Sequence, residues 1–117
     1  MPGEPDFWSV LQELVETTDI TVDRPAGTAH PAFPEFVYPL DYGYLDGTVG
    51  GDGHGVDVWL GGGGHRVTGV FVTADPFKRD AEVKVLLGCG RPELDAISAF
   101  YAGQPQKAVH LPRPSQE

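Results

Sequence analysis

The sequence predicts an α+β fold, mainly β, in which a small closed barrel of about five strands carries a helix at each end of the chain. The prediction depends on short β-branched and aliphatic runs, glycine-rich turns between them, and apolar residues at helical spacing near both ends. The 117 residues include 16 glycines, which supply the turns. We expect a single domain over residues 1–117, with an extra N-terminal helix at 5–18 and the barrel plus the C-terminal helix at 20–110.

Both helices are predicted from apolar stripes. Residues 5–17 show helical periodicity, and Pro5 or Asp6 is a suitable first residue. The stripe of this helix consists of Phe7, Trp8, Leu11, Leu14 and Val15. Pro92 begins the second helix, and Gly103 with Pro105 ends it. Its inner face consists of Leu94, Ile97, Phe100 and Tyr101. We therefore expect each helix to pack its stripe against the strands.

The strands are predicted from alternating or continuous β-branched and aliphatic character. The candidates are residues 20–23, 35–40, 56–60, 66–73 and 82–87. Gly61–Gly64 would close a hairpin between the third and fourth candidates. Pro25, Pro31 and Pro34 indicate an extended connection that cannot be a central strand for long. The tail from 111 to 117 is expected to be loose. Together these strands predict an OB-like barrel.

The composition opposes several kinds of partner. Eight Lys and Arg against 17 Asp and Glu give a formal net charge of -9, which opposes binding to nucleic acid and to anionic membranes. No apolar run approaches the roughly 20 residues of a membrane-spanning helix. The single cysteine, Cys89, cannot form an internal disulfide, and the N-terminus lacks the pattern of a signal peptide. We therefore expect a cytoplasmic protein that binds neither nucleic acid nor membrane.

Residues 38–57 predict a site for cations and phosphate, because tyrosines, aspartates and glycines alternate there without Lys or Arg. In Asp52-Gly-His-Gly-Val-Asp57, the glycines let both carboxylates and His54 approach one ion. A second acidic pair, Asp75 and Asp80, brackets a turn between predicted strands. Four converging carboxylates would suit magnesium or manganese. The alternative is that these aspartates stabilise turns through local hydrogen bonds.

The segment Tyr38-Pro-Leu-Asp-Tyr-Gly-Tyr-Leu-Asp-Gly-Thr48, followed by Asp52-Gly-His-Gly-Val-Asp57-Val, resembles the family I soluble inorganic pyrophosphatases. That family carries a tyrosine-proline-x-x-tyrosine-glycine segment and then aspartate-glycine-aspartate-proline-x-aspartate. Gly69-Val-Phe-Val-Thr-Ala-Asp75 and Asp80 resemble its later strand and turn. The resemblance covers residues 20–88 and implies hydrolysis of pyrophosphate, or of another small phosphoanhydride, by a metal-activated water.

The resemblance also implies roles for individual residues. The implied metal ligands are Asp52, Asp57, Asp75 and Asp80, and Asp23 stands where the family has a metal-associated glutamate. Tyr38 and Tyr42 would line the phosphate pocket, with Tyr42 and Asp57 taking part in catalysis. The implied cofactor is Mg²⁺, with Mn²⁺, Co²⁺ or Zn²⁺ as alternatives.

The chain departs from the family pattern at acidic and basic positions. His54 replaces the middle aspartate of the signature, and we expect it to serve as metal ligand or general base, with a solvated loop residue as the alternative. Glu82 replaces a lysine, and a basic hairpin of the family is missing. The available substitutes are Arg24, His30, Lys78, Arg79, Lys84 and Lys107, of which Arg24 and Lys84 are the predicted substrate ligands.

Two functions are compatible with these residues. The first is metal-dependent hydrolysis of pyrophosphate to two phosphates. The second is a non-catalytic module that binds metal, phosphate or protein, which the missing basic residues favour. The barrel shape would also suit an oligonucleotide binder, which the net charge of -9 opposes. An exposed aromatic pair at Phe7 and Trp8 could mark a homo-oligomer contact.

Overall fold

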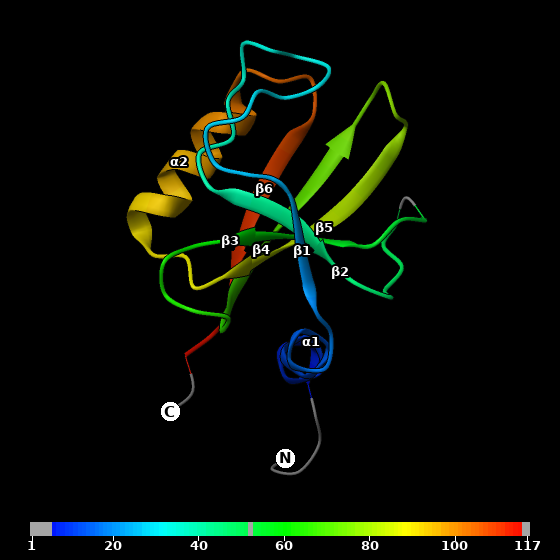
Figure 1. Ribbon diagram of the computed structural model, residues 1–117, viewed down its shortest axis with the longest axis vertical. Helices are drawn as coiled ribbons and strands as arrows, with labels where there is room; N and C mark the ends of the chain where they lie inside the picture. The colour runs from blue at the N-terminus through cyan, green and yellow to red at the C-terminus, as the bar shows by residue number, and fades with distance from the viewer. Residues whose placement is uncertain (1–5, 52, 116–117) are drawn as a thin grey trace.

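In the computed structural model, the described residues are 6–51 and 53–115. The elements are α1 (Phe7–Glu16), β1 (Ile20–Arg24), β2 (Asp41–Leu45), β3 (Val56–Leu60), β4 (Val67–Asp75), β5 (Asp80–Leu87), α2 (Arg91–Ala102) and β6 (Lys107–Pro112). The strands form one mixed sheet in the order β1-β2-β3-β5-β4-β6, in which β3 and β5 are parallel and the other neighbours antiparallel (Figure 1). The predicted α+β class, mainly β, is confirmed.

The closed barrel is not confirmed, because hydrogen bonds do not close the sheet. Over the described residues the sheet has six strands instead of about five, and β1 and β6 are its edges. β6 was not among the predicted strands, and it extends into the tail that we predicted to be loose. Most of its residues are exposed, so this edge strand lacks the apolar alternation by which a half-buried strand is recognised.

Residues 35–40 do not form the predicted strand. After β1, the chain returns to the sheet only at Asp41, where β2 begins. Pro31, Pro34 and Pro39 have no backbone N–H to donate to a neighbouring strand. The segment pairs only locally: an isolated bridge joins Ala29 to Val37, next to two backbone hydrogen bonds of Tyr38. Residues 27–38 therefore fold back on themselves as a loop between β1 and β2.

Gly61–Gly64 connects β3 to β4 but does not close a hairpin, because β3 pairs with β2 and β5. These glycines allow a close approach to the end of β5. A side chain at Gly61 would overlap the carbonyl oxygen of Gly88. The Gly61 N–H donates to the Leu87 carbonyl at 2.8 Å, and the Gly63 N–H donates to the Gly88 carbonyl at 3.0 Å.

The two helices form close to their predicted ranges. The Asp6 carboxylate caps α1 by accepting a hydrogen bond from the Ser9 N–H at 2.8 Å. Pro5, the alternative first residue, lies outside the described residues. α2 begins with Arg91 and Pro92 and ends before Gly103. None of the helices in the described part of the chain has the length and apolar character needed to cross a membrane.

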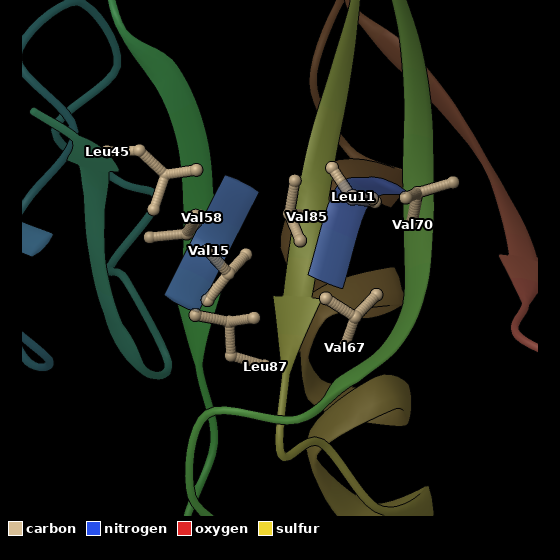
Figure 2. Packing of buried hydrophobic residues seen from close by; sticks show 8 residues of the cluster. All are labelled: Leu11, Val15, Leu45, Val58, Val67, Val70, Val85 and Leu87. Carbon is tan, nitrogen blue, oxygen red and sulfur yellow. The ribbon is translucent and has the colours of Figure 1, made fainter. Parts of the chain in front are cut away.

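Two apolar clusters cover opposite faces of the sheet, because successive side chains of a strand point to opposite sides. Val58, Val70 and Val85 belong to the first cluster, which includes Leu11 and Val15 of α1 (Figure 2). The residues that follow them in the chain belong to the second cluster, with α2: Trp59, Phe71 and Leu86, packed with Ile97, Phe100 and Tyr101. The sheet thus has an α1 face and an α2 face.

Substitution of Gly43, in the middle of β2, tests how closely β1 packs against β2. A side chain there would overlap the Thr21 carbonyl. We predict that Gly43→Ala lowers the free energy of unfolding by about 2 kcal/mol or more, because the two strands must separate. Urea denaturation measures this change. The control is Gly27→Ala, whose added methyl group meets no atom within 4 Å and whose φ of 88° costs about 1 kcal/mol. Equal losses in both variants would contradict this packing.

Candidate functional site

A cavity of about 760 Å³ lies on the α2 face and collects most of the predicted site residues. Its walls come from β1, β2, β3 and β5, from the loop before β2, from the β4–β5 turn and from the end of α2. The predicted residues that line it are Asp23, Arg24, Tyr38, Tyr42, His54, Asp57, Asp75 and Lys84. Asp80 is not among its lining residues, and Asp52 lies outside the described residues.

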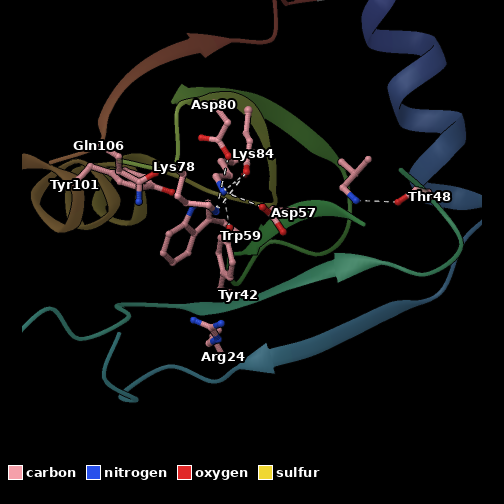
Figure 3. Close-up of polar contacts among 12 residues, drawn as sticks. Arg24, Tyr42, Thr48, Asp57, Trp59, Lys78, Asp80, Lys84, Tyr101 and Gln106 are labelled. Carbon is pink, nitrogen blue, oxygen red and sulfur yellow. Dashed lines mark hydrogen bonds and ion pairs between the residues drawn. The ribbon is translucent and has the colours of Figure 1, made fainter. Parts of the chain in front are cut away.

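Lys84 holds the centre of a buried polar network in the cavity wall (Figure 3). Its ammonium donates hydrogen bonds to Tyr42 Oη at 2.9 Å, to Asp57 Oδ2 at 2.8 Å and to Glu82 Oε1. An ammonium has three N–H donors, so this set uses all of them. Lys84 can therefore contact a ligand only by exchanging one of these partners.

Lys84 stays protonated although only 7% of its side chain is exposed. Burial by itself lowers the pKa of a lysine, but the contacts with Tyr42, Tyr101 and Asp57 outweigh it and raise the pKa of Lys84 above its ordinary value. The carboxylates of Asp57 and Glu82 provide the physical reason, since both are within ion-pair distance of the ammonium. The Lys84 ammonium therefore stays charged throughout the neutral pH range.

Four tyrosines line the cavity, namely Tyr38, Tyr42, Tyr44 and Tyr101, and the hydroxyls of three of them make hydrogen bonds within the protein. The oxygens of Tyr38, Tyr42 and Tyr101 accept hydrogen bonds from Arg24 Nη1 at 3.1 Å, Lys84 Nζ at 2.9 Å and Trp59 Nε1 at 3.2 Å. Burial raises the pKa of Tyr38 and of Tyr42, and raises that of Tyr101 to about 12. Each hydroxyl is therefore protonated at neutral pH, and its O–H can donate to an anion.

Asp75 and Asp80 face each other across the β4–β5 turn, as the last residue pair of the two strands. Asp75 Oδ1 accepts hydrogen bonds from the N–H groups of Phe77 at 2.9 Å and Lys78 at 3.1 Å. This is the turn-stabilising role that the sequence left open. Burial and the neighbouring Glu82 raise the pKa of Asp80, so a cation beside this carboxyl group would be stabilising.

Several side chains that line the cavity are of the types that bind divalent cations. Asp23, Asp57 and Asp75 supply hard oxygen ligands, and His54 supplies a nitrogen. The buried Oε2 of Glu82 accepts no hydrogen bond, which leaves capacity for a further cationic partner besides Lys78 Nζ at 3.7 Å. Within residues 6–51 and 53–115, no three Asp, Glu, His or Cys side chains are grouped closely enough to hold an ion.

Four of the six candidate basic residues line the cavity: Arg24, His30, Lys78 and Lys84. Arg79 and Lys107 lie instead along a neighbouring hollow, together with Asp80. Sequence reasoning missed the aromatic and amide part of the wall, which includes Phe33, Phe77, Phe100, Gln104 and Gln106. From the sequence alone, these residues would be assigned to turns or to the apolar core. Phe100 and Tyr101 were predicted only as part of the inner face of the second helix, not as residues of a site.

His30 forms part of the same wall as a neutral ring. Its Nδ1 accepts hydrogen bonds from the N–H groups of Ala32 at 3.0 Å and Phe33 at 3.3 Å, so this nitrogen carries no proton. The imidazole lies parallel to the Tyr38 ring, with a centroid distance of 6.0 Å and an interplanar angle of 5°. Burial, followed by the positive charges of Arg24 and Lys78, lowers the pKa of His30.

No family model and no curated protein matches the sequence. Solved structures do match. An inorganic pyrophosphatase from Coxiella burnetii has a TM-score of 0.56 and 19% identity over 78% of this chain and 81% of that chain. An inorganic phosphatase from Anaplasma phagocytophilum has a TM-score of 0.50 and 18% identity over 81% of this chain and 80% of that chain. The chain therefore has an inorganic-pyrophosphatase-like fold, and the resemblance is confirmed at the level of the fold.

Removal of the Lys84 ammonium tests the buried network. We predict that Lys84→Met lowers the free energy of unfolding at pH 7 by about 3 kcal/mol, because Asp57 and Glu82 lose their buried cation. Urea denaturation at pH 7 measures the loss. Lys107→Met, at an exposed position, is the control and should change stability by about 0.5 kcal/mol or less. Equal stability of Lys84→Met and the native chain would contradict the network.

The titration of His30 tests its place in the wall. A histidine with a lowered pKa stabilises the fold in its neutral form, and this contribution is lost as the pH falls through 6.5 towards the lower folded-state value. We predict that the His30 imidazole resonances in NMR spectra titrate with a midpoint below 6.5, its ordinary value. A midpoint at or above 6.5 would contradict the partly buried, stacked position. His30→Gln identifies the resonances.

Proposed function

We propose that the protein hydrolyses pyrophosphate, or another small phosphoanhydride, to phosphate with the help of a divalent cation. The observation that carries this proposal is that hydroxyl donors, cationic side chains and carboxylates line one cavity in an inorganic-pyrophosphatase-like fold. This combination can bind a polyanion together with its counter-cation. The similarity of the fold to an inorganic pyrophosphatase and to an inorganic phosphatase supports phosphate chemistry.

The phosphoryl groups would be bound by Tyr38, Tyr42 and Arg24. Both hydroxyls can donate to phosphate oxygens, and the Arg24 guanidinium supplies charge-assisted hydrogen bonds. The carbon Cζ of Arg24 lies 5.9 Å from the centre of the Tyr38 ring, which places the guanidinium over that ring. Lys84, predicted as a substrate ligand, would mainly orient Tyr42 and Asp57, because its three donors are already engaged.

The divalent cation would be held by Asp57, Asp75 and Asp23, which line the cavity, with Asp52 and Asp80 as further predicted ligands. When bound, such a cation neutralises the phosphoanhydride and lowers the pKa of a coordinated water, so that hydroxide is available near neutral pH. Carboxylate ligands favour Mg²⁺, whereas a nitrogen ligand from His54 would favour Mn²⁺, Co²⁺ or Zn²⁺.

His54 is the proposed general base. It lies on the exposed loop that precedes β3 and lines the cavity. An imidazole is a competent base near neutral pH, so His54 would take the proton of the attacking water. Attack on phosphorus forms one P–O bond and breaks the phosphoanhydride bond, and Tyr38, Tyr42 and Arg24 would stabilise the departing phosphate. This assignment involves no covalent intermediate with the protein.

One observation favours the second candidate function, a module that binds a phosphate compound without hydrolysing it. Lys84 occupies Asp57 Oδ2 at 2.8 Å, which leaves this carboxylate less charge for a divalent cation. Release of phosphate is therefore the measurement that separates the two functions.

We predict that the native chain releases phosphate from pyrophosphate only with a divalent cation, tested with Mg²⁺, Mn²⁺, Co²⁺ and Zn²⁺ in turn. Asp57→Asn should lower kcat about 100-fold or more, because the proposed ligand loses its charge, and His54→Gln should do so because the base is lost. Asp95→Asn, an exposed carboxylate on α2, is the control and should have native activity.

Two outcomes of this assay would contradict the proposal. Full turnover of Asp57→Asn would show that Asp57 does not hold the cation. A native chain that is inactive with every cation, while His54→Asp gains activity, would support the non-catalytic module.

A further inference from the structure

The cavity is larger and more aromatic than pyrophosphate requires. Its volume of about 760 Å³ falls within the range of pockets for drug-sized ligands, which are lined mainly by apolar and aromatic side chains. Pyrophosphate consists of two phosphoryl groups and has no apolar surface. Yet Phe33, Phe77 and Phe100 line the same cavity as Arg24 and Lys84.

The aromatic rings form a continuous wall that begins at the charged end of the cavity. Tyr42, which is bonded to Lys84, has its ring centroid 5.4 Å from that of Tyr38. The Tyr38 ring lies 6.0 Å from His30, and the His30 ring lies 5.4 Å from Phe33. Along this wall, Phe33 is thus separated from Tyr42 by two intervening rings, those of Tyr38 and His30.

Packing of the apolar core explains some, but not all, of the aromatic residues that line the cavity. Tyr38 and Phe100 are 5% and 6% exposed, as expected for core residues. Phe77 is 76% exposed, although it lines the cavity and lies on a turn that two hydrogen bonds to Asp75 fix in place. An exposed phenyl ring that lines the same cavity as the proposed phosphate site offers a surface on which a planar group can stack.

Polar groups on the same wall suit the edges of such a planar group. The amides of Gln104 and Gln106 line the cavity, and Gln106 Nε2 donates to Gln104 Oε1 at 3.0 Å. Gln104 is only 2% exposed and its Nε2 donates to the Phe100 carbonyl at 2.7 Å, so its amide is engaged within the protein. The amide of Gln106, which is partly buried, has a second N–H donor and a carbonyl acceptor, and these match the polar edge of a nucleobase. The neutral His30 ring adds a flat surface without a competing charge.

We propose that the ligand is an organic phosphoanhydride with a planar aromatic group, of the nucleoside diphosphate class, bound with its phosphates beside Arg24 and Tyr42 and its base against Phe33 and Phe77. This inference rests on the proposed function and names its substrate class. Because Asp23, Asp57 and Asp75 also line the cavity, the nucleotide would enter as its magnesium complex. Water attacks the terminal phosphorus, the phosphoanhydride bond breaks, the nucleoside monophosphate leaves with the bridging oxygen, and the water proton passes to His54.

Binding of two non-hydrolysable analogues tests the inference by calorimetry in the presence of magnesium. The analogues are methylenediphosphonate and the α,β-methylene analogue of ADP, with the native chain and two alanine variants. We expect the ADP analogue to bind about tenfold tighter or more, and Phe77→Ala to weaken it about fivefold or more while changing methylenediphosphonate less than twofold. Phe77→Trp should keep the affinity. Phe7→Ala, which removes an exposed ring on α1, is the control and should change neither.

Equal binding of the two analogues, absence of binding of the ADP analogue, or equal effects of Phe77→Ala on both would overturn the inference. Phosphate release from ADP and from pyrophosphate separates this failure from failure of the proposed function. Release from pyrophosphate without binding of the ADP analogue keeps the proposed function and overturns the aromatic site. Tight binding of the ADP analogue that depends on Phe77, without phosphate release from either compound, keeps the aromatic site and overturns hydrolysis.

Discussion

The parallel pairing of β3 with β5 places a buried ammonium beside a carboxylate, and the candidate site depends on this contact. Val58 pairs with Val85, so the preceding residues, Asp57 and Lys84, lie side by side on the α2 face. A buried lysine is strongly destabilising unless partners satisfy its charge and its N–H groups. Asp57, Glu82 and Tyr42 provide these partners, and the same bonds fix the directions in which Asp57 and Tyr42 face the cavity.

The two faces of the sheet have separate tasks. On the α1 face, aliphatic residues such as Val58 and Val85 form an apolar core. On the α2 face, Trp59 and Phe71 pack beside the cavity and the polar network of Lys84, whose buried groups need partners. A site built in this way on central strands is held rigidly, whereas the turn that carries Phe77 and the loop that carries His54 contribute from its rim.

The site residues that could be predicted from the sequence are those that stand in a local motif. Tyr38, Tyr42 and Asp57 stand in a recognisable motif, and the structure brings all three to one cavity. The engagement of Lys84 could not be predicted, because it depends on the non-local pairing of β3 with β5. The edge strand β6 was not predicted, because its exposed residues do not alternate in polarity. Phe77 was not predicted because an aromatic residue in a turn has no periodic signal, and only the three-dimensional structure shows that it lines the same cavity as Arg24 and Tyr42.

A crystal structure of the protein with magnesium and methylenediphosphonate is the most direct test of a phosphate site organised by Lys84. The expected result is a phosphonate within hydrogen-bond distance of the Tyr38 and Tyr42 hydroxyls and the Arg24 guanidinium, with magnesium bound to Asp57. Lys84 should keep its bond to Tyr42 or exchange only one partner for the ligand. Binding of the ligand outside this cavity would contradict the account. So would a structure at saturating magnesium and methylenediphosphonate in which the cavity holds neither ion and Lys84 still pairs with Asp57.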